Sequence, residues 1–169
     1  MSISSLSDLF YETLRDVYWA EKQLLKVLPK MAKKAQSPEL AEALESHRVE
    51  TEGHVERLEQ VFAMIDKAAR GKKCEAMVGL SEEGDHVLKD VDEKAIRDIG
   101  IIGSAQAVEH YEIARYGTLA AWAKELGLDD AVDLLVQTLE EEKAADEKPT
   151  MLADDLNGES AETGRKRAA

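Results

Sequence analysis

The sequence predicts an all-α protein built as a bundle of four long helices. Its 169 residues fit a single domain, and 44% of them are apolar, which is enough to bury a core. The chain has only 3 prolines and 10 glycines, too few for the frequent turns of a β-sandwich or barrel. Apolar residues also recur at spacings of three, four and seven over long stretches, which is the pattern of amphipathic helices.

The first two helices are expected to form a hairpin. The first should cover residues 5–35, because Ser5 followed by Asp8 fits a capping box, with Asp in place of the usual Glu. The second should begin at Ser37-Pro38, a serine N-cap followed by proline at the first helical position, and end near Ala69.

Residues 70–92 are expected to form a crossover, because the segment is too long for a hairpin turn. We expect a short helix within it, from Ser81 to about Lys89. The crossover joins the first hairpin to a second one.

The second hairpin contains the third and fourth long helices. The third is expected to run from an N-cap at Asp92 to Leu126, with Gly127 just beyond its end. Asp129 or Asp130 should then cap the fourth helix. Residues 1–156 would thus form one bundle, and residues 157–169 a disordered, solvated tail.

Composition also excludes several classes of function. The net charge of −13 disfavours nucleic acid and anionic membrane surfaces as partners. We expect no signal peptide, because the first ten residues lack a basic region and a long apolar region, and no apolar stretch is long enough to span a membrane. A single cysteine, Cys74, cannot form an internal disulfide, so we expect a reducing, cytoplasmic location.

Every long helix carries polar side chains on its apolar face, which we expect to point into the bundle. Glu21, for example, lies seven residues from both Leu14 and Leu28, on the apolar seam itself. The same interpretation of the other helices gives eight candidate metal ligands: Glu21, His47, Glu50, His54, Glu109, Glu112, Glu142 and Asp146.

Buried carboxylates need a proton, a partner cation or a metal ion. No inward lysine or arginine balances this set, whereas two divalent metal ions would. Carboxylate oxygen and imidazole nitrogen suit iron, manganese or zinc, and carboxylates bridging two metals are the di-iron arrangement of bundle cores. The alternative is a polar core layer without metal, held by water and by Tyr18, Thr51, Tyr116 and Thr138.

Five motifs resemble the YciE/YciF family of bacterial stress-associated proteins over roughly residues 3–150. Two are the most specific: Val108-Glu109-His110-Tyr111-Glu112-Ile113-Ala114 on the third helix, and Cys74-x-x-Met77-x-Gly79-Leu80 in the crossover. The other three are Ala20-Glu21-Lys22-Gln23, His47-x-x-Glu50-Thr51 and Glu140-Glu141-Glu142-Lys143.

The resemblance implies a ferritin-like four-helix bundle that binds metal, is often assigned as a ferroxidase and forms a homodimer. In the wider ferritin-like pattern the second and fourth helices each carry Glu-x-x-His. Here Glu50 and Glu142 match the acids, but Gly53 and Ala145 stand where the histidines are expected. We therefore expect a carboxylate-rich site that departs from the usual coordination.

Two divalent metal ions, iron foremost and manganese or zinc as alternatives, are expected between the helices. The first hypothesis is a stress-response protein that oxidises Fe(II) with dioxygen or peroxide. A second is a non-enzymatic structural or interaction protein with a vestigial or structural metal site, and a third is manganese-dependent peroxide disproportionation. The sequence leaves open whether Glu109 or Glu112 is the ligand, and what Cys74 does.

Overall fold

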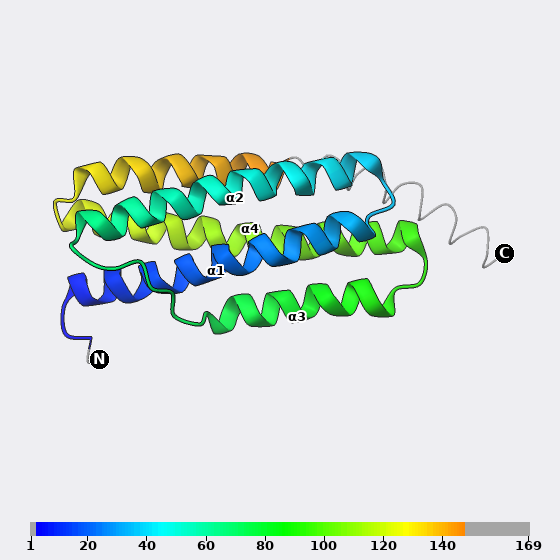
Figure 1. The fold of residues 1–169 in the computed structure, drawn as a ribbon, viewed down its shortest axis with the longest axis horizontal. Coiled ribbons are helices and arrows are strands. Elements are labelled where there is room, and N and C mark those ends of the chain that lie inside the picture. Colours follow the sequence, from blue (N-terminus) through cyan, green and yellow to red (C-terminus); the bar gives the residue numbers. More distant parts are fainter. Residues whose placement is uncertain (1–2, 148–169) are drawn as a thin grey trace.

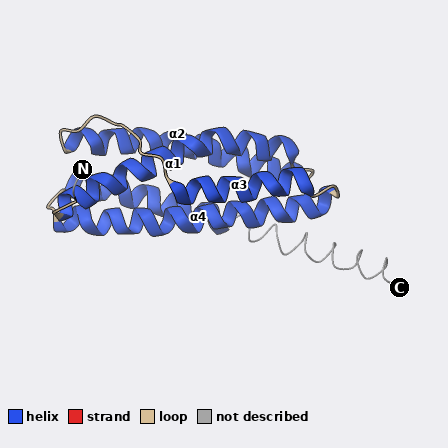
Figure 2. Cartoon of the chain, turned by 90° about the horizontal axis from the view of Figure 1, so that it is seen from below, coloured by secondary structure: helices blue, strands red, loops and turns tan. Residues whose placement is uncertain are grey.

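The computed structural model describes residues 3–147, and this part of the chain consists of helices and loops (Figures 1 and 2). The all-α fold predicted from the sequence is confirmed. Four helices have both ends within the described residues, and a fifth helical stretch follows them: α1 (Leu6–Lys34), α2 (Pro38–Met64), α3 (Glu75–Asp90), α4 (Lys94–Glu125) and residues 129–147, called helix 129–147 below. Across residues 3–147, no helix combines the length and apolarity that a membrane span requires.

The four long helices lie side by side with α3 on the outside. In Figure 1, α1 and helix 129–147 run in one direction, and α2 and α4 run in the other. The connection from α2 to α4 carries the chain back along the bundle, so these two helices are parallel. The shorter α3 belongs to this crossover and packs against α1 and α4.

Two of the predicted helix starts and one helix end are found in the structure. The Ser5 hydroxyl accepts a hydrogen bond from the Asp8 backbone N–H at 3.1 Å. The Ser37 hydroxyl does the same for Leu40 at 3.2 Å, with proline in the first turn. Gly127 follows α4 with a φ of 70°, the left-handed conformation that glycine adopts most readily at the end of a helix.

The predicted end of α2 near Ala69 was wrong, because the helix ends at Met64. The chain turns there: the Lys67 N–H bonds the carbonyl of Phe62 at 3.0 Å, and Asp66 takes a φ of 54°. Backbone bonds of this kind satisfy the last carbonyls of a helix without a glycine.

The start of α3 was also predicted wrongly, at Ser81 instead of Glu75. Cys74 is the N-cap residue, and its sulfur accepts a hydrogen bond from the Met77 N–H at 3.3 Å. The thiol is 1% exposed and lies 2.9 Å from the Tyr111 hydroxyl. Burial raises the pKa of Cys74, so it is a neutral structural thiol and not a reactive thiolate.

The caps predicted for the second hairpin are shifted by one residue. Glu93, not Asp92, precedes α4, and its side chain makes no capping bond. Asp129 and Asp130 lie in the first turn of helix 129–147, after Leu128, where their charges still favour the positive end of the helix dipole.

The core consists of two apolar clusters separated along the bundle. On α1 the first cluster takes residues from Phe10 to Tyr18, and the second from Ala20 to Met31. On α2 the order is reversed, as expected for antiparallel helices. Between the two clusters lies a layer of buried polar residues from α1, α2, α4 and helix 129–147: Glu21, His47, Thr51, His54, Glu109, Glu112, Thr138 and Glu142.

A further buried acid, Asp98 on α4, holds the turn between α1 and α2. Its carboxylate is 1% exposed and accepts backbone hydrogen bonds from Gln36 at 2.8 Å and Ser37 at 2.7 Å. Because each of these donors is otherwise orphaned at the start of α2, Asp98 links both hairpins at one end of the bundle.

Asp98→Ala should lower the free energy of unfolding by about 2–3 kcal/mol, because it leaves two buried backbone donors without a charged acceptor. Urea denaturation measures the change. Asp92→Ala, at an exposed position just before α4, is the matched control and should stay within about 0.5 kcal/mol of the wild type. Equal stability of the two variants would contradict this role of Asp98.

Candidate metal centre

The polar layer brings together six residues that can act as metal ligands. Each is at most 7% exposed, and they come from all four long helices. Their ligand atoms form two groups, in each of which all atoms lie within 4.8 Å of one another: Glu21, His54 and Glu142 in the first, and His47, Glu109, Glu112 and Glu142 in the second.

The first group is completely enclosed. Nδ1 of His54 lies 3.0 Å from Oε1 of Glu142 and 3.4 Å from Oε1 of Glu21, and all three side chains are inaccessible to solvent. The Tyr116 hydroxyl donates a short hydrogen bond to Glu21 and so fixes the orientation of that carboxylate.

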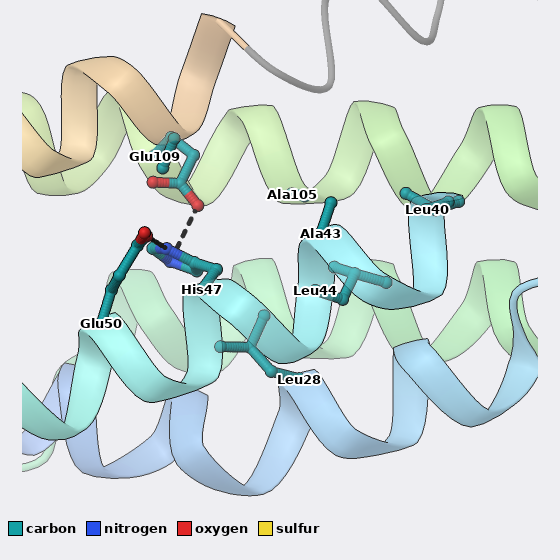
Figure 3. A pocket seen from close by; sticks show the side chains of 9 residues that line it. Leu28, Leu40, Ala43, Leu44, His47, Glu50, Ala105 and Glu109 are labelled. Atoms are coloured by element: carbon teal, nitrogen blue, oxygen red, sulfur yellow. Dashed lines mark ion pairs between the residues drawn. The ribbon is translucent and has the colours of Figure 1, made fainter. Parts of the chain in front are cut away.

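The second group lies next to the first and shares Glu142 with it. Nε2 of His47 is 3.1 Å from Oε1 of Glu109 (Figure 3) and 4.0 Å from Oε2 of Glu142. Since the two oxygens of Glu142 face different histidines, this carboxylate lies between the groups, in the position of a bridging ligand. Glu112 completes the second group.

The layer has more acceptors than donors. Nine buried nitrogen and oxygen atoms on these six residues make no hydrogen bond within the described part of the chain, including both oxygens of Glu112. Some of them, such as Nδ1 of His54 and Oε1 of Glu142, meet only as an ion pair. Buried polar groups almost always have a partner, and no described lysine or arginine is buried among them. The four carboxylates, with two neutral imidazoles, would balance the charge of two divalent cations. The donor set therefore fits a pair of metal ions.

Burial and mutual repulsion disfavour the ionised carboxylates. Burial raises the pKa of Glu112 far above the usual value for glutamate, and the charges of Glu21 and Glu142 raise it further. Burial also raises the pKa of Glu142 to about 8, although the contact with His54 acts in the opposite direction. Without metal, protons must therefore supply part of the missing positive charge.

The two histidines are shifted in the same direction. Burial lowers the pKa of His54, but Glu142 and Glu21 outweigh burial and raise it to about 10. Burial likewise lowers the pKa of His47, and Glu109 and Glu50 reverse this and hold it well above its usual value. Both imidazoles are thus protonated on both nitrogens, and a metal ion that binds would displace one of these protons.

A second set of contacts supports the ligands from outside. Nε2 of His54 lies 3.1 Å from Glu141, and Arg57 pairs with the same carboxylate. Arg57 also donates from Nε to the Thr138 hydroxyl at 2.8 Å. Such a partner on the far nitrogen of a histidine sets which nitrogen faces the metal.

Two of the eight sequence-predicted ligands lie outside the groups. Glu50 is half-buried at the edge, with Oε2 3.5 Å from Nδ1 of His47. Asp146 lies one helical turn after Glu142 and so falls beyond the polar layer along helix 129–147. Its carboxylate is 3.2 Å from Nε2 of the exposed His110. The other six are brought together.

Sequence reasoning missed the outer contacts. Glu141 was not among the predicted ligands or their partners, yet it contacts His54. Arg57 follows His54 by three residues and so shares its helix face, which was an available signal. Tyr18, expected near the polar layer, donates instead to Glu59 at 2.8 Å.

Residues 5–162 match the protein family described as "Domain of unknown function (DUF892)". The chain belongs to this family. Protein YciF from Escherichia coli (strain K12) is 44% identical over 154 residues, which cover 90% of this chain and 93% of YciF. The resemblance to the YciE/YciF proteins seen in the motifs is therefore confirmed.

Solved structures of relatives have the same fold. The crystal structure of the E. coli stress protein YciF matches with a TM-score of 0.89 and 43% identity, over 92% of this chain and 99% of that one. YcfI from Rhodopseudomonas palustris matches with a TM-score of 0.86 and 47% identity, over 88% of this chain and 95% of that one. The match to the DUF892 family thus spans all the helices described above.

The metal-free protein should lose stability as the pH rises from about 5 to about 9. Glu142 and His54 both bind protons more tightly when folded, with pKa values of about 8 and about 10 against 4.5 and 6.5 for the exposed groups. Their stabilising protons are present below the lower value of each pair and are lost as the pH passes the upper value.

Urea denaturation in the presence of a chelator, at several pH values, measures this slope. Glu142→Gln should flatten it, and Glu140→Gln, which changes an exposed neighbour, should leave it unchanged. A wild-type stability that rises with pH over this range would contradict the assignment of protons to the buried layer.

Proposed function

We propose that the protein binds two divalent metal ions, iron foremost, and oxidises Fe(II) with dioxygen or peroxide. The observation that carries the proposal is the pair of ligand groups that share Glu142, enclosed in a layer with an excess of buried acceptors. The ferritin-like assignment and the role in stress follow the resemblance to YciF, which is a stress protein.

The six ligand residues would form two adjacent metal positions. Glu21 and His54 would hold one ion, His47, Glu109 and Glu112 the other, and Glu142 both. The four carboxylates favour Fe(III) over Fe(II), because an anionic, enclosed site stabilises the higher charge more. Two Fe(II) ions held there as substrate would supply the two electrons that, with two protons, reduce dioxygen to hydrogen peroxide and leave two Fe(III) ions. His47 and His54 hold protons in the metal-free site and release them when iron binds.

A structural role without turnover is the second candidate. It is favoured by the protonated histidines, which balance much of the buried charge without metal. The description of YcfI suggests such a role for that relative. The two candidates differ in whether the polar layer takes up iron and whether bound Fe(II) is consumed faster than free Fe(II).

Metal stoichiometry and oxidation rate decide between them. Full-length protein, purified without a metal-binding tag and stripped with a chelator, is titrated anaerobically with Fe(II) and then exposed to dioxygen. We expect about two irons per chain and oxidation faster than in protein-free buffer. Glu142→Ala should weaken iron binding by on the order of 100-fold or more, because even partners outside the ligand shell contribute about 10–100-fold.

Glu140→Ala is the matched control, since Glu140 lies two residues away and its side chain faces solvent. Circular dichroism establishes that both variants are folded. Failure of the wild type to bind iron would overturn the proposal. Two bound irons without faster oxidation would leave a structural metal site, and binding of manganese alone with peroxide consumption would favour disproportionation.

A further inference from the structure

A small pocket reaches the metal-ligand cluster from one side. It has a volume of about 30 Å³ and lies between α1, α2, α4 and helix 129–147. Its walls are apolar, formed mainly by Leu28, Leu40, Ala43, Leu44 and Ala105 (Figure 3). Three of these residues lie on α2. Ala43 is half-buried, whereas Leu40 and Leu44 are at most 5% exposed.

The inner end of the pocket is polar and belongs to the second ligand group. His47 and Glu109 both line it, and Glu50 lies beside His47 at its edge (Figure 3). Glu21 and His54 do not line it and are inaccessible to solvent. A molecule in the pocket would therefore meet the position held by His47 and Glu109 first.

The size and lining of the pocket select a small apolar molecule. A cavity needs about 10–15 Å³ to hold one water, and a cavity of about 150 Å³ can hold benzene. At about 30 Å³ this pocket offers about twice the space that one water needs, which suits a molecule of about two heavy atoms. Water, and likewise peroxide, needs two or more polar partners. The leucine and alanine walls offer none, so such a molecule is held only at the polar end beside His47 and Glu109, whereas an apolar molecule can occupy the whole pocket.

We infer that this pocket binds dioxygen and leads it to the side of the centre formed by His47 and Glu109. Dioxygen is diatomic and apolar, so it fits the volume and loses no hydrogen bonds on entering. Its role in oxidation rests on the proposed function, but its binding in the pocket does not. A second void, near Leu80 and Val108, also reaches Glu109, but at about 10 Å³ it is too small for two heavy atoms.

Paramagnetic relaxation by dissolved dioxygen tests the binding in the metal-free, full-length protein. With ¹³C-labelled leucine methyl groups, those of Leu28, Leu40 and Leu44 should relax faster under oxygen pressure than those of Leu14 and Leu58. The last two are as deeply buried but lie in the other apolar cluster. Equal enhancement at all five leucines would overturn the proposal.

Filling the pocket tests the same point by mutation. Ala43→Leu should abolish the selective relaxation of Leu28 and Leu40, because the added side chain occupies the space. Ala41→Leu, at a similarly half-buried position on α2 that does not line the pocket, should preserve it. If Ala43→Leu does not fold, Ala105→Val narrows the pocket from α4. Unchanged selective relaxation in a folded pocket-filling variant would overturn the proposal.

Iron then tests the role in oxidation. Ala43→Leu should slow the oxidation of bound Fe(II) by dioxygen several-fold while the anaerobic iron stoichiometry stays as in Ala41→Leu. An unchanged rate in a folded variant would show that dioxygen takes another path and would overturn the access role. Selective methyl relaxation in a protein that binds no iron would refute the proposed function and leave the dioxygen pocket standing, so the two failures are distinct.

Discussion

Four carboxylates buried at one level of the bundle are the constraint on which the rest of the structure depends. An ionised carboxylate in a protein interior loses several kcal/mol of solvation free energy unless a cation or hydrogen bonds replace the water. Glu21, Glu109, Glu112 and Glu142 share two histidines, and no described lysine or arginine is buried with them. The apolar clusters on either side supply the stability that holds these side chains together without a complete set of partners.

The centre has two inequivalent sides. Glu142 faces His54 with one oxygen and His47 with the other, so it joins the two ligand groups. The side of His54 is enclosed and supported by Glu141 and Arg57. The side of His47 adjoins the apolar pocket. An enclosed position next to an accessible one suits the proposed function, in which a small oxidant would meet two metal ions.

Helical periodicity was enough to predict the helices, their hairpins and the inward acids, because a buried polar side chain among leucines stands out on a helical wheel. It was not enough for features set by tertiary contacts. Asp146 has nearly the same phase as Glu142, but one more turn carries it past the layer to His110. The cap made by the Cys74 sulfur depends on a backbone bond that no sequence pattern marks. Whether Glu109 or Glu112 is a ligand could not be decided because the structure places both in the same group.

Anomalous X-ray diffraction from crystals loaded with Fe(II) under anaerobic conditions tests the central claim most directly. The account predicts two iron peaks in the polar layer, one within reach of Glu21 and His54 and the other within reach of His47 and Glu109, with Glu142 between them. Iron bound only at surface acids, with the six side chains left as a hydrogen-bonded, protonated layer, would contradict it.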